Sequence, residues 1–175
     1  MKNNCIFVEK NMKQSFSNFN INKNNILAYA LIKEISVNPK IIASPILIVG
    51  ENGVGKTHLM IALENEVKDK TNVIRISSEQ FLEETKQVVR TKNINGIYGK
   101  YGKTDILIIE NIEFLIKYYK KPIDILHDLI KKLTVENSKI VLLTVGMNLK
   151  KVKNIKVIEE LKLNDFEDLL IVDVK

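Results

Sequence analysis

Short runs of apolar, mostly β-branched residues alternate along the chain with longer stretches of mixed polarity. Five such runs predict strands: Ile46–Val49, Val73–Ile76, Ile106–Ile109, Ile140–Thr144 and Leu169–Val172. Apolar runs without polar interruption are typical of strands that are covered on both faces, as they are in parallel sheets. The pattern therefore predicts a five-stranded parallel sheet.

Apolar residues at helical spacing separate most of these strands. They predict helices at Asn24–Ser36, Lys56–Val67, Glu79–Arg90 and Pro122–Leu133, with a further helical piece near Val157–Leu163. Strands that alternate with helices are typical of a three-layer α/β domain. We therefore expect a polar N-terminal segment, residues 1–22, in which Phe7, Phe16 and Phe19 are packing anchors, followed by one α/β domain, residues 23–175.

The first predicted strand leads directly into a glycine-rich loop and then a helix. Gly55-Lys56-Thr57 follows Gly50 at the spacing of a phosphate-binding P-loop. In this motif main-chain N–H groups surround a polyphosphate, the lysine reaches the β- and γ-phosphates, and the hydroxyl binds Mg²⁺. We predict that the loop binds ATP or ADP with Mg²⁺. Its predicted nucleotide-binding residues are Gly50, Asn52, Gly53, Val54, Gly55, Lys56, Thr57 and His58. For His58 the alternative role is simple packing on the helix that follows the loop.

The third predicted strand ends in two polar residues, Glu110 and Asn111. In P-loop NTPases an acid at this position steadies Mg²⁺, and a carboxylate nearby orients the attacking water. Glu110 can fill the metal role together with Thr57, whereas Asn111 stands where the second carboxylate is expected. An amide can orient water but cannot accept its proton. Glu110 and Asn111 are therefore the candidate catalytic residues, and the second of them is a weak one.

Composition limits the cellular setting. The chain has 175 residues and a formal net charge of +6, which permits an anionic partner but also fits an AT-rich codon bias. The single cysteine, Cys5, excludes an internal disulfide. No apolar run reaches the length of a membrane span, and the N-terminus lacks the features of a signal peptide. We expect a cytoplasmic protein without membrane contacts.

Taken together, these motifs and their surroundings resemble the AAA+ domain of the bacterial replication initiator family, DnaA. The segments that carry the resemblance are Ser15–Phe19, Asn25–Ala30, Asn38-Pro39, Ser44–Ile48, His58–Met60, Ser78–Phe81, Tyr101, Asp105, Ile109–Leu115, Phe166 and Leu170–Val172. The resemblance implies a nucleotide-binding protein that acts in initiation of DNA replication or in its regulation. It also places the segment around Phe19 against the adenine.

Several features of that family are not matched. The sensor-1 segment, normally Thr-Ser-Asp, aligns with Thr144-Val145-Gly146, and the arginine finger falls on Asn164-Asp165-Phe166. An arginine finger contributes on the order of 10³–10⁵ in rate. We also expect the chain to lack the family's helical lid, with its sensor-2 arginine, and its helix-turn-helix domain. These differences predict hydrolysis that is slow or absent.

Basic residues with interleaved tyrosines follow the second and third predicted strands. In the DnaA family the corresponding regions line the path of single-stranded DNA, and cations beside aromatic rings suit such binding. The resemblance thus implies five tentative DNA contacts, at Lys86, Arg90, Lys117, Lys120 and Lys121. The alternative is an ordinary solvated lysine surface.

The implied partners are single-stranded DNA, full-length DnaA or helicase machinery, and further copies of this chain. Two other functions stay open: an interaction module in which the nucleotide only stabilises the fold, and a partner-activated ATPase of the helicase-loader type. A small-molecule kinase is disfavoured because the only two arginines, Arg75 and Arg90, are not placed as in a kinase lid.

Overall fold

A five-stranded sheet forms the centre of the computed structural model, which describes residues 14–39, 45–91, 94–116, 120–154 and 156–175. All paired strands are parallel, and their order is β2-β3-β4-β1-β5. The strands are β1 (Pro45–Val49), β2 (Val73–Ser77), β3 (Ile106–Glu110), β4 (Ile140–Val145) and β5 (Leu170–Asp173). The predicted parallel sheet is confirmed.

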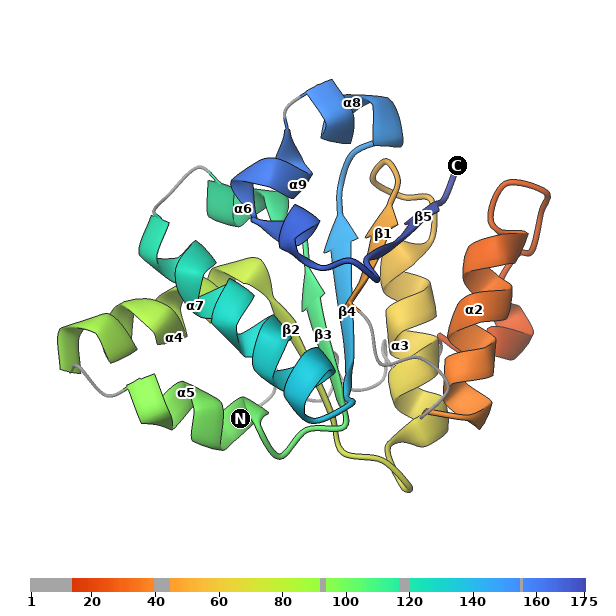
Figure 1. Ribbon diagram of the computed structural model, residues 1–175. Helices are drawn as coiled ribbons and strands as arrows, with labels where there is room; N and C mark the ends of the chain where they lie inside the picture. Colours follow the sequence, from red (N-terminus) through yellow and green to blue (C-terminus); the bar gives the residue numbers. More distant parts are fainter. Residues whose placement is uncertain (1–13, 40–44, 92–93, 117–119, 155) are drawn as a thin grey trace, which may run out of the picture.

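Helices cover both faces of this sheet (Figure 1). One face carries η1 (Phe16–Asn18), α2 (Ile26–Val37) and α3 (Lys56–Val67). The other carries α4 (Ser78–Thr91), α5 (Ile94–Tyr101) and α7 (Lys120–Lys131), which runs on into the π-helical turn η2 (Lys132–Glu136). Shorter elements lie towards the carboxyl ends of the strands: α6 (Glu113–Ile116), α8 (Leu149–Asn154), α9 (Val157–Glu160) and η3 (Leu163–Asp165).

Alternate residues of each central strand enter the two apolar cores. In β3, Ile106 and Ile108 pack on the side of α2 and α3, whereas Leu107 and Ile109 pack on the side of α4 and α7. All four are fully buried. This double burial explains why the strand is apolar up to its last residue, Glu110, which lies at its carboxyl end.

Two local features were not predicted. In the first helix Ile35 is buried, as one of the apolar residues that predicted it, but Leu27 is 77% exposed, and Ala28 and Ile32 complete the face that is buried against α3. The helix α5 was not predicted, because its two glycines lower its intrinsic helix propensity. It is held instead by packing, since its residues Ile97 and Tyr101 are buried in the core that includes α4.

The N-terminal segment contributes to the core in its described part. Phe16 and Phe19 are buried, and a 3-10 turn connects them, whereas Phe7 lies outside the described residues. Nowhere in the described ranges does a helix have both the length and the apolar character needed to cross a bilayer.

Candidate nucleotide-binding site

The glycine-rich loop connects the carboxyl end of β1 to the amino end of α3, as the sequence predicts. Gly53 and Gly55 have φ angles of 87° and 107°, in the left-handed region that favours glycine. Lys56 is buried beneath the loop, and its Nζ donates hydrogen bonds to the carbonyl oxygens of Gly50 and Glu51 at 2.7 and 2.8 Å. The loop therefore closes around its own lysine, with the ammonium group held by main-chain oxygens.

The surroundings of Lys56 change its protonation. Burial lowers the pKa of its ammonium group below the ordinary value of 10.5, because the charged form loses hydration. The negative charges of Glu113 and, to a smaller extent, Glu110 oppose that shift. A polyphosphate would add further negative charge next to the ammonium group. Nucleotide binding should therefore raise the pKa of Lys56.

The two predicted metal-binding residues meet across the site. Thr57 Oγ1, at the start of α3, donates a hydrogen bond to Glu110 Oε2, at the end of β3, at 2.7 Å. Carboxylate and hydroxyl oxygens are the ligands that Mg²⁺ prefers in nucleotide sites. The pair fits the metal role that the sequence assigned to it.

Arg75 adds a contact to this pair that the sequence analysis missed. From β2, its Nη1 donates to Glu110 Oε1 at 2.6 Å and its Nε donates to Glu64 Oε2 at 2.7 Å. Burial alone would lower the pKa of Arg75, but the hydrogen bonds to Glu64 and Glu110 outweigh it and raise the pKa above its ordinary value. The sequence signal was a charged residue within an otherwise apolar strand.

Asn111 is fixed through its main chain rather than its side chain. Its φ angle is 59°, its N–H donates to Thr144 Oγ1 at 3.1 Å, and its carbonyl accepts from Ser78 Oγ at 2.8 Å. The residue itself is exposed. This places Asn111 at the edge of the site, next to the end of β4.

Glu113 also enters the site, although the sequence analysis did not single it out. Its Oε1 accepts a hydrogen bond from the N–H of Gly146 at 2.8 Å. A Cβ atom built on Gly146 would lie 2.6 Å from Glu113 Oε1 and 2.8 Å from Asn52 Oδ1. The glutamate on α6 and the P-loop asparagine therefore both occupy space that a side chain at position 146 would need.

The N-terminal segment lies against the other side of the P-loop. A Cβ atom on Gly55 would lie 2.8 Å from the Phe19 ring, which also stacks on Tyr29 at a centroid separation of 5.7 Å. His58 Nε2 lies 2.9 Å from the carbonyl oxygen of Ser15, and the His58 ring meets Phe19 edge-on. His58 thus holds the segment that carries Phe19 in place, beyond the simple helix packing that was its alternative.

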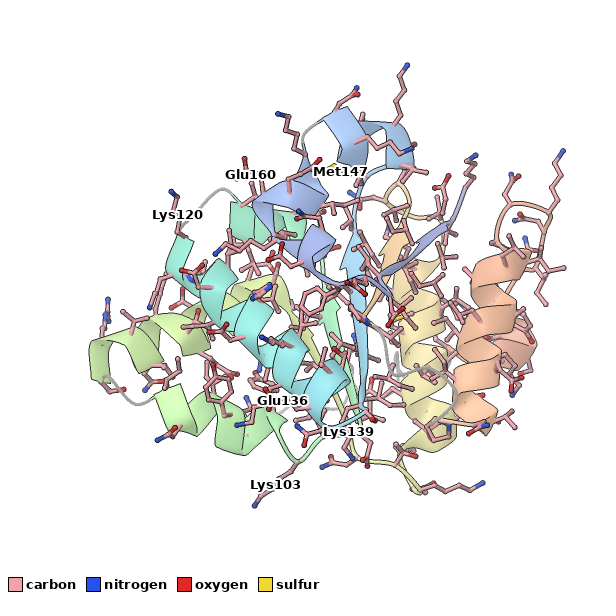
Figure 2. The ribbon with its side chains drawn as sticks, in the orientation of Figure 1. Lys103, Lys120, Glu136, Lys139, Met147 and Glu160 are labelled. Carbon is pink, nitrogen blue, oxygen red and sulfur yellow. The ribbon has the colours of Figure 1, made fainter. Side chains whose placement is uncertain are left out.

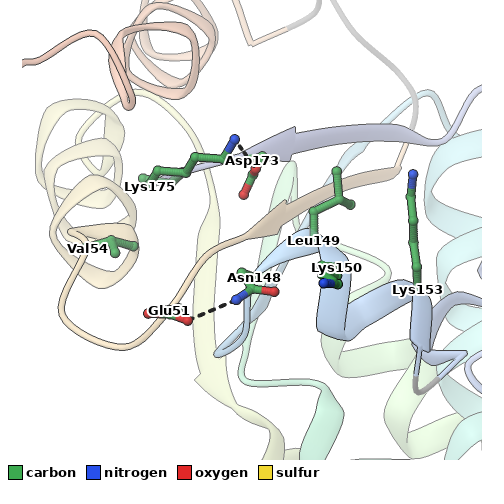
Figure 3. Close-up of a pocket in the computed structure, with 9 residues that line it drawn as sticks. Glu51, Val54, Asn148, Leu149, Lys150, Lys153, Asp173 and Lys175 are labelled. Carbon is green, nitrogen blue, oxygen red and sulfur yellow. Dashed lines mark hydrogen bonds and ion pairs between the residues drawn. The ribbon is translucent and has the colours of Figure 1, made fainter.

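A hollow of about 670 Å³ opens beside the P-loop (Figure 3). Glu51 and Val54 line it from the loop, and Leu149 and Lys153 line it from α8. Asn148 Nδ2 donates to Glu51 Oε1 at 2.9 Å between two of the residues that line it. Next to this hollow, a Cβ atom on Gly50 would lie 2.4 Å from the carbonyl oxygen of Val174, so only glycine fits there.

Three of the five residues predicted to contact DNA come together on the face formed by α4 and α7. Lys86, Arg90 and Lys121 line a hollow of about 320 Å³ together with Val89 and Pro122. Lys86 also pairs with Glu83 at 2.8 Å. Of the other two, Lys120 is exposed at the start of α7, where Figure 2 labels it, and Lys117 lies outside the described residues.

The aspartate that aligns with the arginine finger faces its own chain. Asp165 Oδ2 lies 3.2 Å from Nε2 of His127 on α7, and the His127 ring contacts Phe166 at 5.2 Å between centroids. Asp165 thus contacts α7, and it is an acid at the position where the family has an arginine.

A strand, a glycine loop and a helix that enclose a lysine, with an acid at the tip of a neighbouring strand, define a P-loop nucleotide-binding protein. The sequence profile of the bacterial DnaA ATPase domain matches residues 10–173. The chain therefore belongs to the DnaA family of AAA+ domains, as its motifs predicted.

Similar curated proteins are chromosomal replication initiators. The DnaA protein of Helicobacter hepaticus is 36% identical over 101 residues, which cover 57% of this chain and 22% of that protein. The DnaA protein of Geotalea uraniireducens is 35% identical over 117 residues, which cover 65% and 26%. The matched region thus spans about a quarter of these relatives or less.

Solved structures agree with the fold. AMPPCP-bound DnaA from Aquifex aeolicus superimposes with a TM-score of 0.76 at 26% identity, over 93% of this chain and 50% of that one. A DnaA structure bound to AMPPCP and single-stranded DNA gives a TM-score of 0.77 at 24% identity, with the same coverage. The DnaC helicase loader shares the fold at a TM-score of 0.71 and 16% identity.

Proposed function

We propose that this chain binds ATP or ADP with Mg²⁺ and acts in initiation of DNA replication or its regulation, with hydrolysis that is slow or absent when the chain is alone. The observation that carries the proposal is the P-loop around Lys56, with Thr57 and Glu110 in contact beside it. In this arrangement Lys56 and the loop amides would hold the β- and γ-phosphates, and Thr57 and Glu110 would hold the metal. Mg²⁺ would neutralise phosphate charge there.

Slow hydrolysis follows from the groups around this cradle. Asn111 has no carboxylate to accept a proton, and Asp165 carries the wrong charge to stabilise a γ-phosphate in a neighbouring subunit. The loss of an arginine finger alone corresponds to about 10³–10⁵ in rate. The bound nucleotide would therefore persist long enough to define a stable state of the protein.

Calorimetric titration with ATP and with ADP, each with Mg²⁺, tests the binding. The variant Lys56→Ala should abolish it, whereas Lys68→Ala, exposed just beyond the other end of α3, is the matched control and should bind as the unaltered chain does. Equal affinity of ATP for the Lys56→Ala variant and the control would refute the assignment.

Single-stranded DNA is the proposed partner of the face formed by α4 and α7. A hollow lined by Lys86, Arg90 and Lys121, with the exposed apolar side chain of Val89, offers both phosphate contacts and an apolar surface for a base. A DnaA structure of the same fold holds single-stranded DNA. Three of the residues that the resemblance assigns to DNA contact therefore lie on one common surface.

Anisotropy of a labelled oligothymidine at two salt concentrations tests this surface. Each phosphate contact contributes about 0.7 to the slope of log affinity against log salt for single strands. The double variant Arg90→Glu, Lys121→Glu should bind at least tenfold more weakly with a smaller slope. A matched pair of charge reversals at Lys150 and Lys151, both exposed on α8, should change affinity less. Equal losses from the two pairs would indicate nonspecific attraction.

An interaction module with a structural nucleotide is the second candidate. The contact of Asp165 with His127 favours this second function. The family has its arginine finger at this position, where it acts on a neighbour's γ-phosphate, whereas Asp165 is an acid that contacts its own chain. A ligand stabilises the folded state by RT ln(1 + [L]/Kd). Equal thermal shifts with ADP and ATP at the same ligand concentration would favour this function, and a larger shift with ATP would favour a nucleotide-dependent switch.

A further inference from the structure

We propose that Glu113 is the catalytic carboxylate for the slow hydrolysis of the bound nucleoside triphosphate, in place of Asn111. This inference rests on the proposed function, because it needs ATP in the P-loop. The sequence alone indicates that the site has lost its water-activating acid at position 111 and its polar group at position 146. The structure brings another carboxylate, from α6, to the same end of the sheet.

The position of the Glu113 carboxylate is defined by its neighbours. Oε1 accepts the hydrogen bond from the N–H of Gly146, just after β4. The same oxygen, together with Asn52, occupies the space that a Cβ atom on Gly146 would fill. Asn52 belongs to the P-loop, so the carboxylate lies beside the loop, and its charge acts on Lys56 beneath it. Any side chain at position 146 would displace the carboxylate. The glycine at the end of β4 is therefore what allows Glu113 to enter the site.

The second oxygen of this carboxylate is free for a ligand. Glu113 Oε2 is buried, and within the described ranges it has no hydrogen-bond partner. A buried carboxylate oxygen without a partner is costly, and such groups are typical of sites that receive a proton or a bound water. The charge of Glu113 also acts on Lys56, which in P-loop proteins contacts the phosphates of the nucleotide.

Asn111 offers no comparable chemistry. Its amide cannot accept a proton, and both of its main-chain groups are bonded to Thr144 and Ser78. These bonds hold the residue at the edge of the site with its side chain exposed. Of the three residues that follow β3, positions 111 to 113, Glu113 on α6 is thus the one whose carboxylate can act as base.

The proposed step transfers one proton and breaks one phosphate bond. A water molecule held by Glu113 Oε2 attacks the γ-phosphorus, and its proton passes to that oxygen. The bond from the γ-phosphorus to the bridging oxygen breaks, and its electron pair stays on the ADP. The proton on Glu113 then leaves with the inorganic phosphate or to solvent, which restores the carboxylate. Lys56 stabilises the charge on the phosphates throughout.

Single-turnover hydrolysis with the 175-residue chain in excess over radiolabelled ATP and Mg²⁺ tests the proposal. Glu113→Gln keeps an acceptor oxygen for the Gly146 N–H but removes the base. It should lower the rate at least tenfold, within the 10²–10⁴-fold range of general-base catalysis, while the Kd for ATP stays within threefold. Glu136→Gln, at the opposite end of the sheet (Figure 2), is the matched control and should hydrolyse at the unaltered rate.

A second variant covers the case in which Glu113→Gln does not fold. Gly146→Ala leaves the charge in place but its Cβ would lie 2.6 Å from Oε1, so the carboxylate must move and the rate should fall at least tenfold. Rates within threefold of the unaltered chain for either folded variant would overturn the proposal, as would an unaltered rate no higher than that of Lys56→Ala. If ATP does not bind the unaltered chain at all, the proposed function fails; tight binding with unchanged rates removes only the role of Glu113.

Discussion

Replacing Arg75 by methionine should destabilise the folded state because it leaves the buried carboxylate of Glu110, the proposed metal ligand, without its cationic partner. Arg75 and Glu110 have side-chain exposures of only 17% and 9%, and their atoms meet at 2.6 Å. Removing one partner of a fully buried ion pair costs about 3–5 kcal/mol. Glu110 keeps the Thr57 hydroxyl, so we expect about 2–3 kcal/mol, below that range. For a domain of this size that corresponds to a Tm lower by about 4–12 °C.

Urea unfolding and a double-mutant cycle can separate the contributions. Glu64 is 33% exposed, so Glu64→Gln removes only the outer bond of Arg75 and should cost no more than about 1 kcal/mol. Adding Glu110→Gln to Arg75→Met should recover part of the loss, with a coupling energy of about 1 kcal/mol or more between the two sites. Mg-ATP should raise the Tm of Arg75→Met by more than that of the unaltered chain, because the metal would supply the missing positive charge.

Two results would refute this reasoning. If Arg75→Met loses no more stability than Glu64→Gln, the bond to Glu110 contributes nothing beyond an exposed pair. If the cycle shows no coupling between Arg75 and Glu110, the loss comes from packing of the arginine stem instead. Either result would leave Glu110 in the site but would show that Arg75 does not hold its carboxylate in position.

Three further outcomes are expected. Gly55→Ala should weaken ATP at least tenfold in calorimetry, because φ is 107° there and a Cβ would lie 2.8 Å from Phe19, with left-handed strain of about 1–3 kcal/mol. The affinity for ATP should fall up to tenfold per pH unit as pH rises above the lowered pKa of Lys56 in the free protein, because the charged ammonium binds the phosphates better. Between that pKa and the higher pKa of the complex, binding should take up a proton, which calorimetry in buffers of different ionisation enthalpy measures. Tyr101→Phe should cost about 1–3 kcal/mol in urea unfolding, because the buried hydroxyl that donates to Glu84 at 2.6 Å is lost.

The strands and the P-loop could be predicted because their signals are local. Each central strand is buried on both faces, so it is apolar until it nears its carboxyl end and stands out from its surroundings. The loop requires glycine where φ is positive, and a lysine and a hydroxyl at fixed places after it. Both patterns reflect constraints within a dozen residues, which a single sequence displays directly.

The contacts that complete the site could not be predicted in this way. Arg75, Glu110 and Glu64 meet because β2 lies beside β3, and the end of β4 reaches the P-loop because β4 lies beside β1. Strand order depends on the whole fold and leaves no trace within any one strand. The buried face of α2 could not be predicted for the same reason. Which of its apolar residues are buried depends on its packing against α3, which is decided by the whole fold.

Gly146, just after β4, shows why a position that departs from a family pattern has to be interpreted together with its neighbours in space. In the sequence, Gly146 counts as the loss of a polar side chain near the γ-phosphate. In the structure, the absence of a Cβ at that position is what leaves room for the carboxylate of Glu113, held by the Gly146 N–H itself. A small residue just after one strand and an acid on a nearby helix can thus be complementary changes. Substituting both residues, Gly146→Asp with Glu113→Gln, should therefore be tolerated better in thermal unfolding than Gly146→Asp alone, which would place two carboxylates against each other.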